Sequence, residues 1–311
     1  MKNCEVLVLL ATYNGEKFVR EMIDSVINQD ADSFHIILSD DASSDSTVGI
    51  LDEYAEKYPE LITHYRSGKK FGNAQNHFMH LLSQFHDAPY IMFCDQDDYW
   101  HSDKIRKTLA KMKEIETEGV PALVHTDLVV VDGDLKKIAD SFCGYQKLDG
   151  NRLKLNQLLV QNVVTGCTMM INNSLADLSC RCALPKAALM HDWWIAIICS
   201  VFGTSAFLDC STIDYRQHGN NSVGAKNVTS PSYLLAKLKS GAMKKSLRGA
   251  AGQAEAFLEC YGDIIPQDKK EVVAAFAETK DASLLRRSGI YIKHHLFKYG
   301  ITRLLAQFLG G

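Results

Sequence analysis

The sequence predicts an α/β fold in which a parallel or mixed sheet is flanked by helices, with a helical region at the C-terminal end. Three observations support this prediction. Four apolar runs of strand length alternate with amphipathic helical segments over about the first 120 residues. Each run is apolar at nearly every position, as in strands buried on both faces of a parallel sheet. Beyond Pro231 the pattern is almost entirely helical.

The expected elements follow one another along the chain. Strands are expected at residues 5–11, 35–38, 61–65 and 90–94. Apolar side chains recur at helical spacing at 17–29, 44–58 and 73–85. Farther on, a helix beginning near residue 191 and short strands are expected, the strands at 122–125, 168–171 and 204–208. We therefore expect one domain over residues 1–230 and a helical appendage over 231–311.

Composition restricts the class of protein. The 311 residues carry a net charge of -3 and are 46% hydrophobic, which excludes a disordered chain and argues against a nucleic-acid partner. The nine cysteines are odd in number and scattered, with no second pair to complete a zinc site beside Cys180 and Cys182. The longest apolar stretch, 193–208, falls short of the ~20 residues that span a bilayer. The N-terminus lacks a signal peptide's pattern, so a cytoplasmic protein is expected.

Charge is divided unevenly between the two regions. Residues 1–230 hold 21 basic and 30 acidic side chains, which leaves 13 basic and 7 acidic side chains for residues 231–311. From Arg286 onward there are five Lys or Arg, no Asp or Glu, and many interleaved apolar residues. Such a basic amphipathic segment can bind peripherally to an anionic membrane surface. It can equally well pack on the first domain or form a homo-oligomer.

Polar clusters follow three of the four expected strands. T-Y-N-G-E (12–16) follows the first strand, S-D-D (39–41) the second, and D-Q-D-D (95–98) the fourth. Ligands bind at the carboxyl ends of strands in open α/β sheets, so these clusters are expected to meet in one crevice. Aspartates at this density repel one another unless a cation is bound, and Mg²⁺ prefers carboxylate and phosphate oxygens. The pattern predicts a metal-assisted diphosphate site.

Each cluster taken alone also has a structural explanation, because Asp and Ser are the preferred helix-capping residues. Capping explains S-D-D-A-S-S-D about as well as ligand binding does. It explains only one of the three carboxylates in D-Q-D-D-Y-W, so a functional role is favoured there.

The order of these motifs resembles that of the family-2 glycosyltransferases, which have the GT-A fold. Three later segments narrow the resemblance to bacterial rhamnosyltransferases of cell-wall polysaccharide and O-antigen synthesis. These segments are N-V-V-T-G-C-T-M-M-I-N (162–172), M-H-D-W-W (190–194) and Y-R-Q-H-G-N-N-S-V-G-A (215–225). The resemblance covers most of residues 1–230. It implies a Rossmann-like domain that binds a nucleotide sugar through residues 1–120 and an acceptor through residues 121–230.

The resemblance implies a set of donor-binding residues and a metal site. The residues that would contact the nucleotide sugar are Thr12, Tyr13, Glu16, Asp40, Asp41, Asn73, Asn76, Asp95 and Gln96. Asp97 would bind Mg²⁺ or Mn²⁺, and His218 would complete the metal shell, since a mixed carboxylate and imidazole shell tolerates either ion. An Arg-containing loop common in other members is replaced by Asn73 and Asn76, so Lys69 or Lys70 is expected to supply the positive charge.

Asp192 matches the catalytic base of inverting members. A carboxylate within hydrogen-bond reach of the acceptor hydroxyl can take its proton as the oxygen attacks the anomeric carbon. A metal-bound nucleoside diphosphate leaves without a second carboxylic acid. Apart from the resemblance, favourable charge at a helix N-terminus would explain Asp192 more simply.

Four residues are candidates for the acceptor site: Gly166, His191, Trp193 and Trp194. Each has a structural alternative, since Gly166 could mark a bulge and His191 could simply pack at the start of a helix. Of the two tryptophans, we expect one to stack on a sugar and the other to lie in the core.

We therefore predict an inverting, metal-dependent enzyme that transfers L-rhamnose from dTDP-L-rhamnose to a lipid-linked bacterial glycan. Transfer from a UDP-hexose or UDP-N-acetylhexosamine is the alternative within the same fold. A sugar nucleotidyltransferase would be expected to have a Gly-rich, basic phosphate loop after the first strand, and T-Y-N-G-E is not one. A non-catalytic glycan-binding protein would not need Asp97, Asp192 and His218 together.

Overall fold

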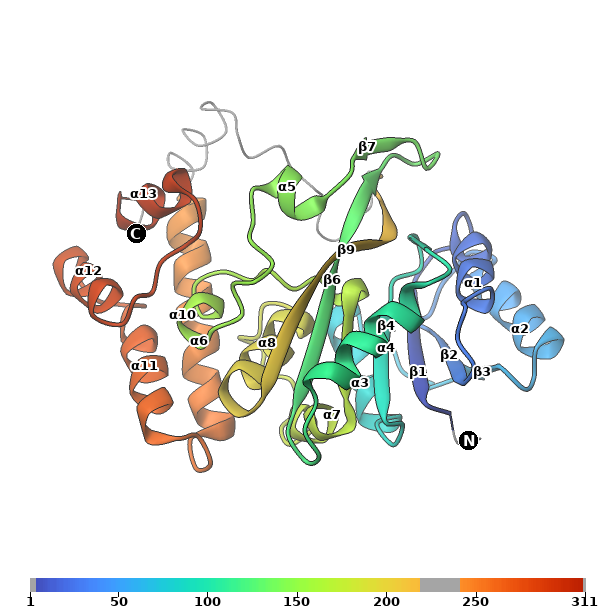
Figure 1. Cartoon of the computed structure of the whole chain (residues 1–311), viewed down its shortest axis with the longest axis horizontal. Coiled ribbons are helices and arrows are strands. Elements are labelled where there is room, and N and C mark those ends of the chain that lie inside the picture. Colours follow the sequence, from blue (N-terminus) through green and yellow to red (C-terminus); the bar gives the residue numbers. More distant parts are fainter. Residues whose placement is uncertain (1–3, 219–240, 310–311) are drawn as a thin grey trace.

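The computed structural model describes residues 4–218 and 241–309, and a nine-stranded mixed sheet runs through its centre (Figure 1). The strand order is β3-β2-β1-β4-β8-β6-β9-β5, and β7 pairs with β6. β3, β2, β1 and β4 are parallel, whereas β8 is antiparallel to both β4 and β6. The strands are β1 Val6–Thr12, β2 Phe34–Asp40, β3 Ile62–Tyr65, β4 Tyr90–Cys94, β5 Tyr99–Trp100, β6 Ala122–Val131, β7 Lys137–Ala139, β8 Met169–Asn172 and β9 Thr204–Arg216.

Helices cover both faces of the sheet. Those of the first region are α1 Val19–Ile27, α2 Thr47–Lys57, α3 Ala74–Gln84, α4 Lys104–Ile115, α5 Phe142–Gln146, α6 Leu155–Leu158, the 3₁₀ turn η1 Gly166–Thr168, α7 Asn173–Ser179 and α8 His191–Phe202. Alternate side chains of β1 point to opposite faces of the sheet. Val6 and Val8 pack with side chains of α1, α2 and α4, while Leu7 and Leu9 pack with those of α3 and α8. This two-sided burial explains the continuous apolar runs.

The parallel strands β1, β2 and β4 place their carboxyl ends at one edge of the sheet. Thr12 is opposite Asp40 in the register of β1 and β2, and Leu10 is opposite Cys94 in the register of β1 and β4. The polar residues that follow each strand therefore meet at this edge, as the motif order predicts.

The two long strands differ from the expected short ones. β6 extends over ten residues and β9 over thirteen, and they pair in parallel with register shifts around Asp127. β9 is half-exposed over most of its length and contains Asp209, Cys210 and Asp214, so it lacks the apolar run that marks the other strands. Its far end matters for function, because it carries Tyr215 and Arg216 to the edge where the polar residues meet.

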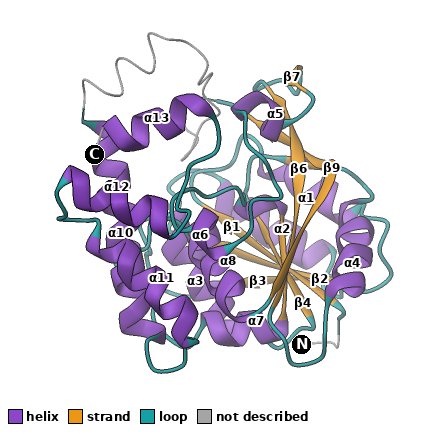
Figure 2. Ribbon diagram, turned by 60° about the vertical axis from the view of Figure 1, so that its left-hand side comes forward, coloured by secondary structure: helices purple, strands orange, loops and turns teal. Residues whose placement is uncertain are grey.

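The C-terminal helices share a core with the first region. They are α10 Ala242–Tyr261, α11 Gln267–Glu278, α12 Leu284–Lys293 and α13 Ile301–Leu309, and they gather on one side of the sheet (Figure 2). The Trp194 ring of α8 lies 5.7 Å from that of Phe257 and 6.1 Å from that of Tyr261, between ring centroids. One hydrophobic cluster joins these residues to β1 and β4. The helical region is thus packed onto the sheet domain through an apolar interface.

Parts of α12 and α13 nonetheless expose large apolar side chains. On α13, Ile301, Leu305 and Leu309 are 78%, 54% and 74% exposed, and their spacing of four residues puts them on one face. Leu285 and Ile292 are exposed on α12. Across the described ranges, the helices are all too short or too polar to traverse a bilayer.

Candidate active site

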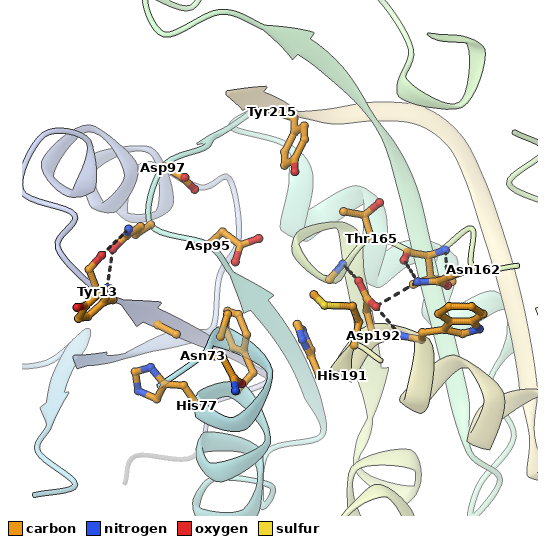
Figure 3. A pocket seen from close by; sticks show the side chains of 18 of the residues that line it. Tyr13, Asn73, His77, Asp95, Asp97, Asn162, Thr165, His191, Asp192 and Tyr215 are labelled. Carbon is orange, nitrogen blue, oxygen red and sulfur yellow. Dashed lines mark hydrogen bonds between the residues drawn. The ribbon is translucent and has the colours of Figure 1, made fainter. Parts of the chain in front are cut away.

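A cavity of about 740 Å³ lies at the carboxyl edge of the sheet (Figure 3). Its walls come from the ends of β1, β2, β4 and β9, the start of α3, the segment before η1, and the start of α8. Of the residues proposed from sequence, it is lined by Thr12, Tyr13, Asp41, Asn73, Asp95, Gln96, Asp97, Gly166, His191, Asp192 and Trp193. Lys70 also lines it, and its ammonium group lies 5.7 Å from the centre of the Tyr13 ring.

Gln96 ties two of the polar loops together. Its Oε1 accepts from the Tyr13 N–H at 2.8 Å, and its Nε2 donates to the Tyr13 carbonyl at 3.0 Å. Gly15 lies directly beside this pair, and a Cβ there would stand 2.2 Å from the Gln96 Oε1. The side chain of Gln96 therefore links the loop after β1 to the loop after β4. Position 15 must be glycine, because any larger residue would clash with the Gln96 amide.

The carboxylates that follow β2 are occupied by loop backbone. Asp40 accepts from the Thr12 hydroxyl at 2.8 Å and from the Ser43 N–H at 2.7 Å, and it lies outside the cavity wall. Asp41, which does line the cavity, accepts from the N–H groups of Phe71 and Gly72, the latter at 2.8 Å. Asp41 thus holds the loop that carries Lys70 over the donor side of the cavity.

Three other donor-side candidates also serve local structure. Asn73 caps α3, because its side chain accepts from the Asn76 N–H at 2.9 Å. The Asn76 amide faces the Phe71 carbonyl at 3.5 Å, and Glu16 accepts from the Ser46 N–H at 2.9 Å. Asn76 and Glu16 do not line the cavity, so a role in contacting the donor would require them to act through these loops.

Asp95, Asp97 and His218 form the part of the site that suits a divalent cation. The Nε2 of His218 and the Oδ2 of Asp97 are 2.8 Å apart, as expected of two groups that can ligate one ion. Burial, followed by repulsion from Asp97 and Asp192, raises the pKa of Asp95 above its ordinary value. A cation would relieve this repulsion, so the donor set fits Mg²⁺ or Mn²⁺.

A second group of possible ligand atoms lies beneath this pair, with Asp95, Asp98 and Cys167 atoms within 4.8 Å of one another. Asp98 is fully buried and accepts from the Arg216 N–H at 3.2 Å. Burial, followed by the neighbouring carboxylates, raises the pKa of Asp98 well above its ordinary value. Asp97 lines the cavity, whereas Asp98 and Cys167 do not, so Asp97 and its partner His218 remain the better candidates.

Arg216 is an important residue that sequence reasoning did not single out, although it stands inside the quoted Y-R-Q-H segment. It is 2% exposed, and its guanidinium donates to the Asp97 carbonyl at 2.8 Å, the Gly133 carbonyl at 2.7 Å and the Glu21 carboxylate at 2.5 Å. It also lies 4.5 Å from the centre of the Phe18 ring. Arg216 therefore fixes the backbone that carries Asp97. It also stands two residues before His218 in the chain.

Asp192 lies across the cavity from this group, at the start of α8. Its Oδ2 accepts from the Gly166 N–H at 2.9 Å, and its Oδ1 accepts from the Asn162 amide at 3.1 Å and from the Trp193 N–H at 2.5 Å. Burial raises the pKa of Asp192 to about 6, even though these three hydrogen bonds lower it. Asn162, another residue of a quoted segment without an assigned role, thus orients this carboxylate.

The two tryptophans have different environments. Trp193 lines the cavity, and its Nε1 donates to the Leu158 carbonyl at 2.6 Å. Trp194 is fully buried against α10, so its ring cannot stack on an acceptor sugar, and the assignment of Trp194 to the acceptor site is corrected. Helical geometry explains the split, since successive residues of a helix point about 100° apart.

The wall on the Asp192 side is mostly apolar. Besides Trp193, it includes side chains that sequence reasoning did not predict, namely Phe142, Leu148, Val163, Val164 and Met190. Tyr215 and His77 also line the cavity and were likewise missed. Burial lowers the pKa of His77 to about 4, and its Nε2 is 2.8 Å from the Ser39 hydroxyl. Apolar loop residues have no periodic pattern, so only folding reveals that they converge.

Comparison with known proteins decides the family. The sequence model of the family described as "Glycosyl transferase family 2" matches residues 7–177, which is more than half of the chain. The chain belongs to glycosyl transferase family 2. The chain is thus a glycosyltransferase, and the cavity holds the motifs on which the sequence resemblance depends.

One similar protein is dTDP-rhamnosyl transferase RfbG of Shigella flexneri. It is 30% identical over 224 residues, which cover 70% of this chain and 74% of the relative. Staphylococcus aureus TarS 1–349 in complex with UDP-GlcNAc has a TM-score of 0.59 at 16% identity, covering 93% of this chain and 76% of that chain. The mannosyltransferase PcManGT of Pyrobaculum calidifontis, with GDP-Man and Mn²⁺, has a TM-score of 0.53 at 14% identity, covering 100% and 85%. These two likenesses establish the GT-A fold for this family member.

Proposed function

We propose that this family-2 glycosyltransferase inverts the anomeric centre as it transfers L-rhamnose from dTDP-L-rhamnose to a hydroxyl of a growing glycan. The observation that carries the proposal is the placement of Asp192 across one cavity from Asp95 and from Asp97, which is paired with His218. A base on one side and a diphosphate site on the other is the arrangement that direct displacement at the anomeric carbon requires.

Asp192 is the proposed base. Its carboxylate accepts the proton of the acceptor hydroxyl as the acceptor oxygen attacks the sugar from the face opposite the diphosphate. Three N–H donors, from Asn162, Gly166 and Trp193, hold the carboxylate in one orientation. A pKa of about 6 leaves Asp192 mainly ionised at neutral pH while keeping it basic enough to take a proton.

On the donor side, Asp97 and His218 would hold the divalent cation, with Asp95 toward the ribose. The cation would neutralise charge on the departing nucleoside diphosphate. Arg216 keeps the Asp97 backbone in place through its hydrogen bond to the Asp97 carbonyl. Lys70 provides a positive charge at the same side of the cavity, in place of the arginine of other members.

The donor can be identified by incubating the purified protein with Mg²⁺ or Mn²⁺ and a panel of nucleotide sugars without acceptor. We expect slow release of dTDP from dTDP-L-rhamnose. The 30% identity to dTDP-rhamnosyl transferase RfbG supports this choice. Release of UDP from a UDP-hexose or UDP-N-acetylhexosamine instead would overturn the rhamnosyl assignment and retain the transferase. If no donor is hydrolysed, binding of each nucleotide by calorimetry decides between them.

The proposed acceptor is lipid-linked, and α13 supports this part of the proposal. The apolar wall on the Asp192 side of the cavity is the proposed acceptor wall. α13 packs beside it, because Arg303 donates to the Lys147 carbonyl at 2.7 Å and to the Gln146 carbonyl at 2.5 Å, next to Leu148. Its outer face presents the apolar row Ile301, Leu305 and Leu309. Ala306 packs against Met243 and Leu247 of α10, and Lys244 and Lys245 of the same helix are exposed. Apolar and basic groups together suit an anionic bilayer surface.

Sedimentation with lipid vesicles tests this attachment. We expect binding to phosphatidylglycerol-containing vesicles, none to pure phosphatidylcholine, and loss of binding in the triple variant I301S/L305S/L309S. The matched control is L285S/I292S on α12, which should still bind. Truncation of the chain before α12 is not a suitable test, because Tyr291 and Leu296 are fully buried and their loss would disturb the core. Unchanged sedimentation of the triple variant would refute the attachment. If the wild-type protein is instead a dimer that the triple variant converts to monomers, the apolar row of α13 binds a second copy of the chain.

A further inference from the structure

His191 has an unusual environment for a polar side chain at an active site. It is 3% exposed, and neither ring nitrogen has a hydrogen-bond partner among the described residues. Its ring is held between Phe78, with centroids 4.7 Å apart, and Phe93, with centroids 5.4 Å apart. Buried polar atoms are normally paired, so an unpaired imidazole beside a catalytic base needs an explanation.

Burial also determines the charge of this ring. It lowers the pKa of His191 to about 3, so the imidazole is neutral at physiological pH. A neutral imidazole has one donor and one acceptor nitrogen, so it can either donate a hydrogen bond to a hydroxyl group or accept one from it. It cannot attract the diphosphate by charge, and it cannot replace Asp192 as the base.

The position of His191 indicates which substrate it meets. Figure 3 shows the ring between Asp95, on the diphosphate side, and Asp192, with Asn162 beyond Asp192. The space beside the ring is kept free by Gly166, where a Cβ would stand 2.7 Å from the His191 Nε2. The transferred sugar must lie between the diphosphate and the base, and the acceptor hydroxyl enters between that sugar and Asp192.

We propose that His191 binds the sugar ring of the donor, through a hydrogen bond between its neutral imidazole and a ring hydroxyl, rather than the acceptor. This inference rests on the proposed function and specifies a residue that recognises the transferred sugar. Surrounding atoms cover both nitrogens, so the sugar reaches them after rotation of the ring about its Cβ–Cγ bond or a small displacement of the Gly166 turn. The cost of leaving the imidazole unpaired is then recovered only when the donor sugar is bound.

The test compares His191→Phe with wild type. Phenylalanine keeps the aromatic packing on Phe78 and Phe93 and removes both nitrogens. We expect the melting temperature to rise or stay constant, dTDP binding to stay constant, and kcat/KM for dTDP-L-rhamnose to fall about 10- to 100-fold. His191→Gln should recover part of the loss. Unchanged kcat/KM in His191→Phe would overturn the inference.

Donors that lack single hydroxyls identify the contact. For wild type, one deoxy donor should lose about the same factor that His191→Phe loses, and that donor should show no further loss with the variant. Phe93→Leu is the packing control: it should lower stability but leave the discrimination between donor and deoxy donor intact. If Phe93→Leu abolishes this discrimination, His191 acts through packing and the inference fails.

Nitrogen NMR decides the question without any variant activity. In protein with ¹⁵N-labelled histidine, the His191 ring resonances, assigned with His191→Gln, should shift when dTDP-L-rhamnose is added and stay in place with dTDP alone. If both ligands leave them unmoved, the inference is wrong. If only a UDP-sugar is a donor, the same experiment with that sugar still tests His191, while the rhamnosyl proposal fails separately.

Discussion

The two walls of the cavity are built differently. The side of the cavity that carries Asp95 and Asp97 is the one that we propose binds the donor, and we call it the donor wall. On and behind it, Asp41, Gln96 and Arg216 each use two or more hydrogen bonds to hold the backbone of another loop. On the acceptor wall, apolar side chains such as Leu148 and Val163 dominate, and the hydrogen bonds to Asp192 are the main polar contacts.

This difference separates two tasks. A nucleotide diphosphate and a cation demand fixed geometry, and a network of buried hydrogen bonds supplies it. The proposed acceptor glycan would meet a surface whose apolar groups impose little directional preference. Substitutions on the donor wall should therefore disturb geometry and stability together, and those on the acceptor wall should change affinity for the acceptor.

The largest effect is expected at Asp192. Asp192→Asn keeps the size of the side chain and removes the base, so transfer should fall by about 10³-fold. Binding of dTDP, measured by calorimetry, should remain within a factor of two or so of wild type, because the donor wall is unaltered. Wild-type turnover in this variant would mean that the base has been assigned to the wrong residue.

Arg216→Met should destabilise the donor wall. It leaves the Asp97 and Gly133 carbonyls and the Glu21 carboxylate without their shared donor. We expect the free energy of unfolding to fall by about 3 kcal/mol and Mn²⁺ affinity, measured by electron paramagnetic resonance, to fall about 10-fold. The matched control is Arg20→Met, which removes an exposed pair with Glu53 and should cost less than about 1 kcal/mol. Equal losses in both variants would contradict the role of Arg216.

The pH dependence of transfer should report the acceptor-side base. The ionised form of Asp192 is active, so kcat/KM should fall about tenfold per pH unit below pH 6. Asn162→Ala removes a hydrogen bond that lowers the pKa of Asp192, so its acid limb should move to higher pH. Asp95 also titrates near Asp192, whereas His191 stays neutral. The pH dependence of donor binding is therefore measured separately and subtracted from that of kcat/KM. An identical limb in both proteins would exclude Asp192 as its source.

The smallest effect is expected on the apolar wall. Trp193→Phe loses the hydrogen bond to the Leu158 carbonyl and part of the ring surface, so KM for the acceptor should rise a few-fold with kcat unchanged. Trp194→Phe serves as the comparison, because it should reduce stability by about 1–2 kcal/mol and leave KM alone. A lowered kcat in Trp193→Phe would show that Trp193 contributes to the chemistry itself.

Much of the donor wall could be predicted from sequence because it stands at strand ends. Strands such as β1 and β4 are apolar throughout, so their last residues are easy to locate, and the polar residues after them are brought together by parallel pairing. The prediction of the GT-A fold with a helical C-terminal region is confirmed. The length of β9 was underestimated, since its half-exposed surface and its acidic residues obscure the strand pattern.

The rest of the site depends on contacts that no local pattern records. Arg216 looks like any arginine near a strand end until folding places Glu21 and Gly133 beside it. Trp193 lines the cavity and Trp194 lies in the core because of where α10 packs, and the two adjacent tryptophans cannot be told apart from the sequence. Gln96 was assigned to the donor by position, whereas its amide is engaged with the Tyr13 backbone.

The packing of Trp194 on Phe257 and Tyr261 also bears on how such enzymes can be recombined. The helix α8 begins with His191 and Asp192, and two residues after Asp192 it contacts α10 through Trp194. A chimera that joined this sheet domain to the C-terminal helices of another member would place foreign side chains against Trp194, and any misfit would be transmitted to Asp192. Exchange of acceptor preference by grafting should therefore succeed only when α8 travels together with α10–α13.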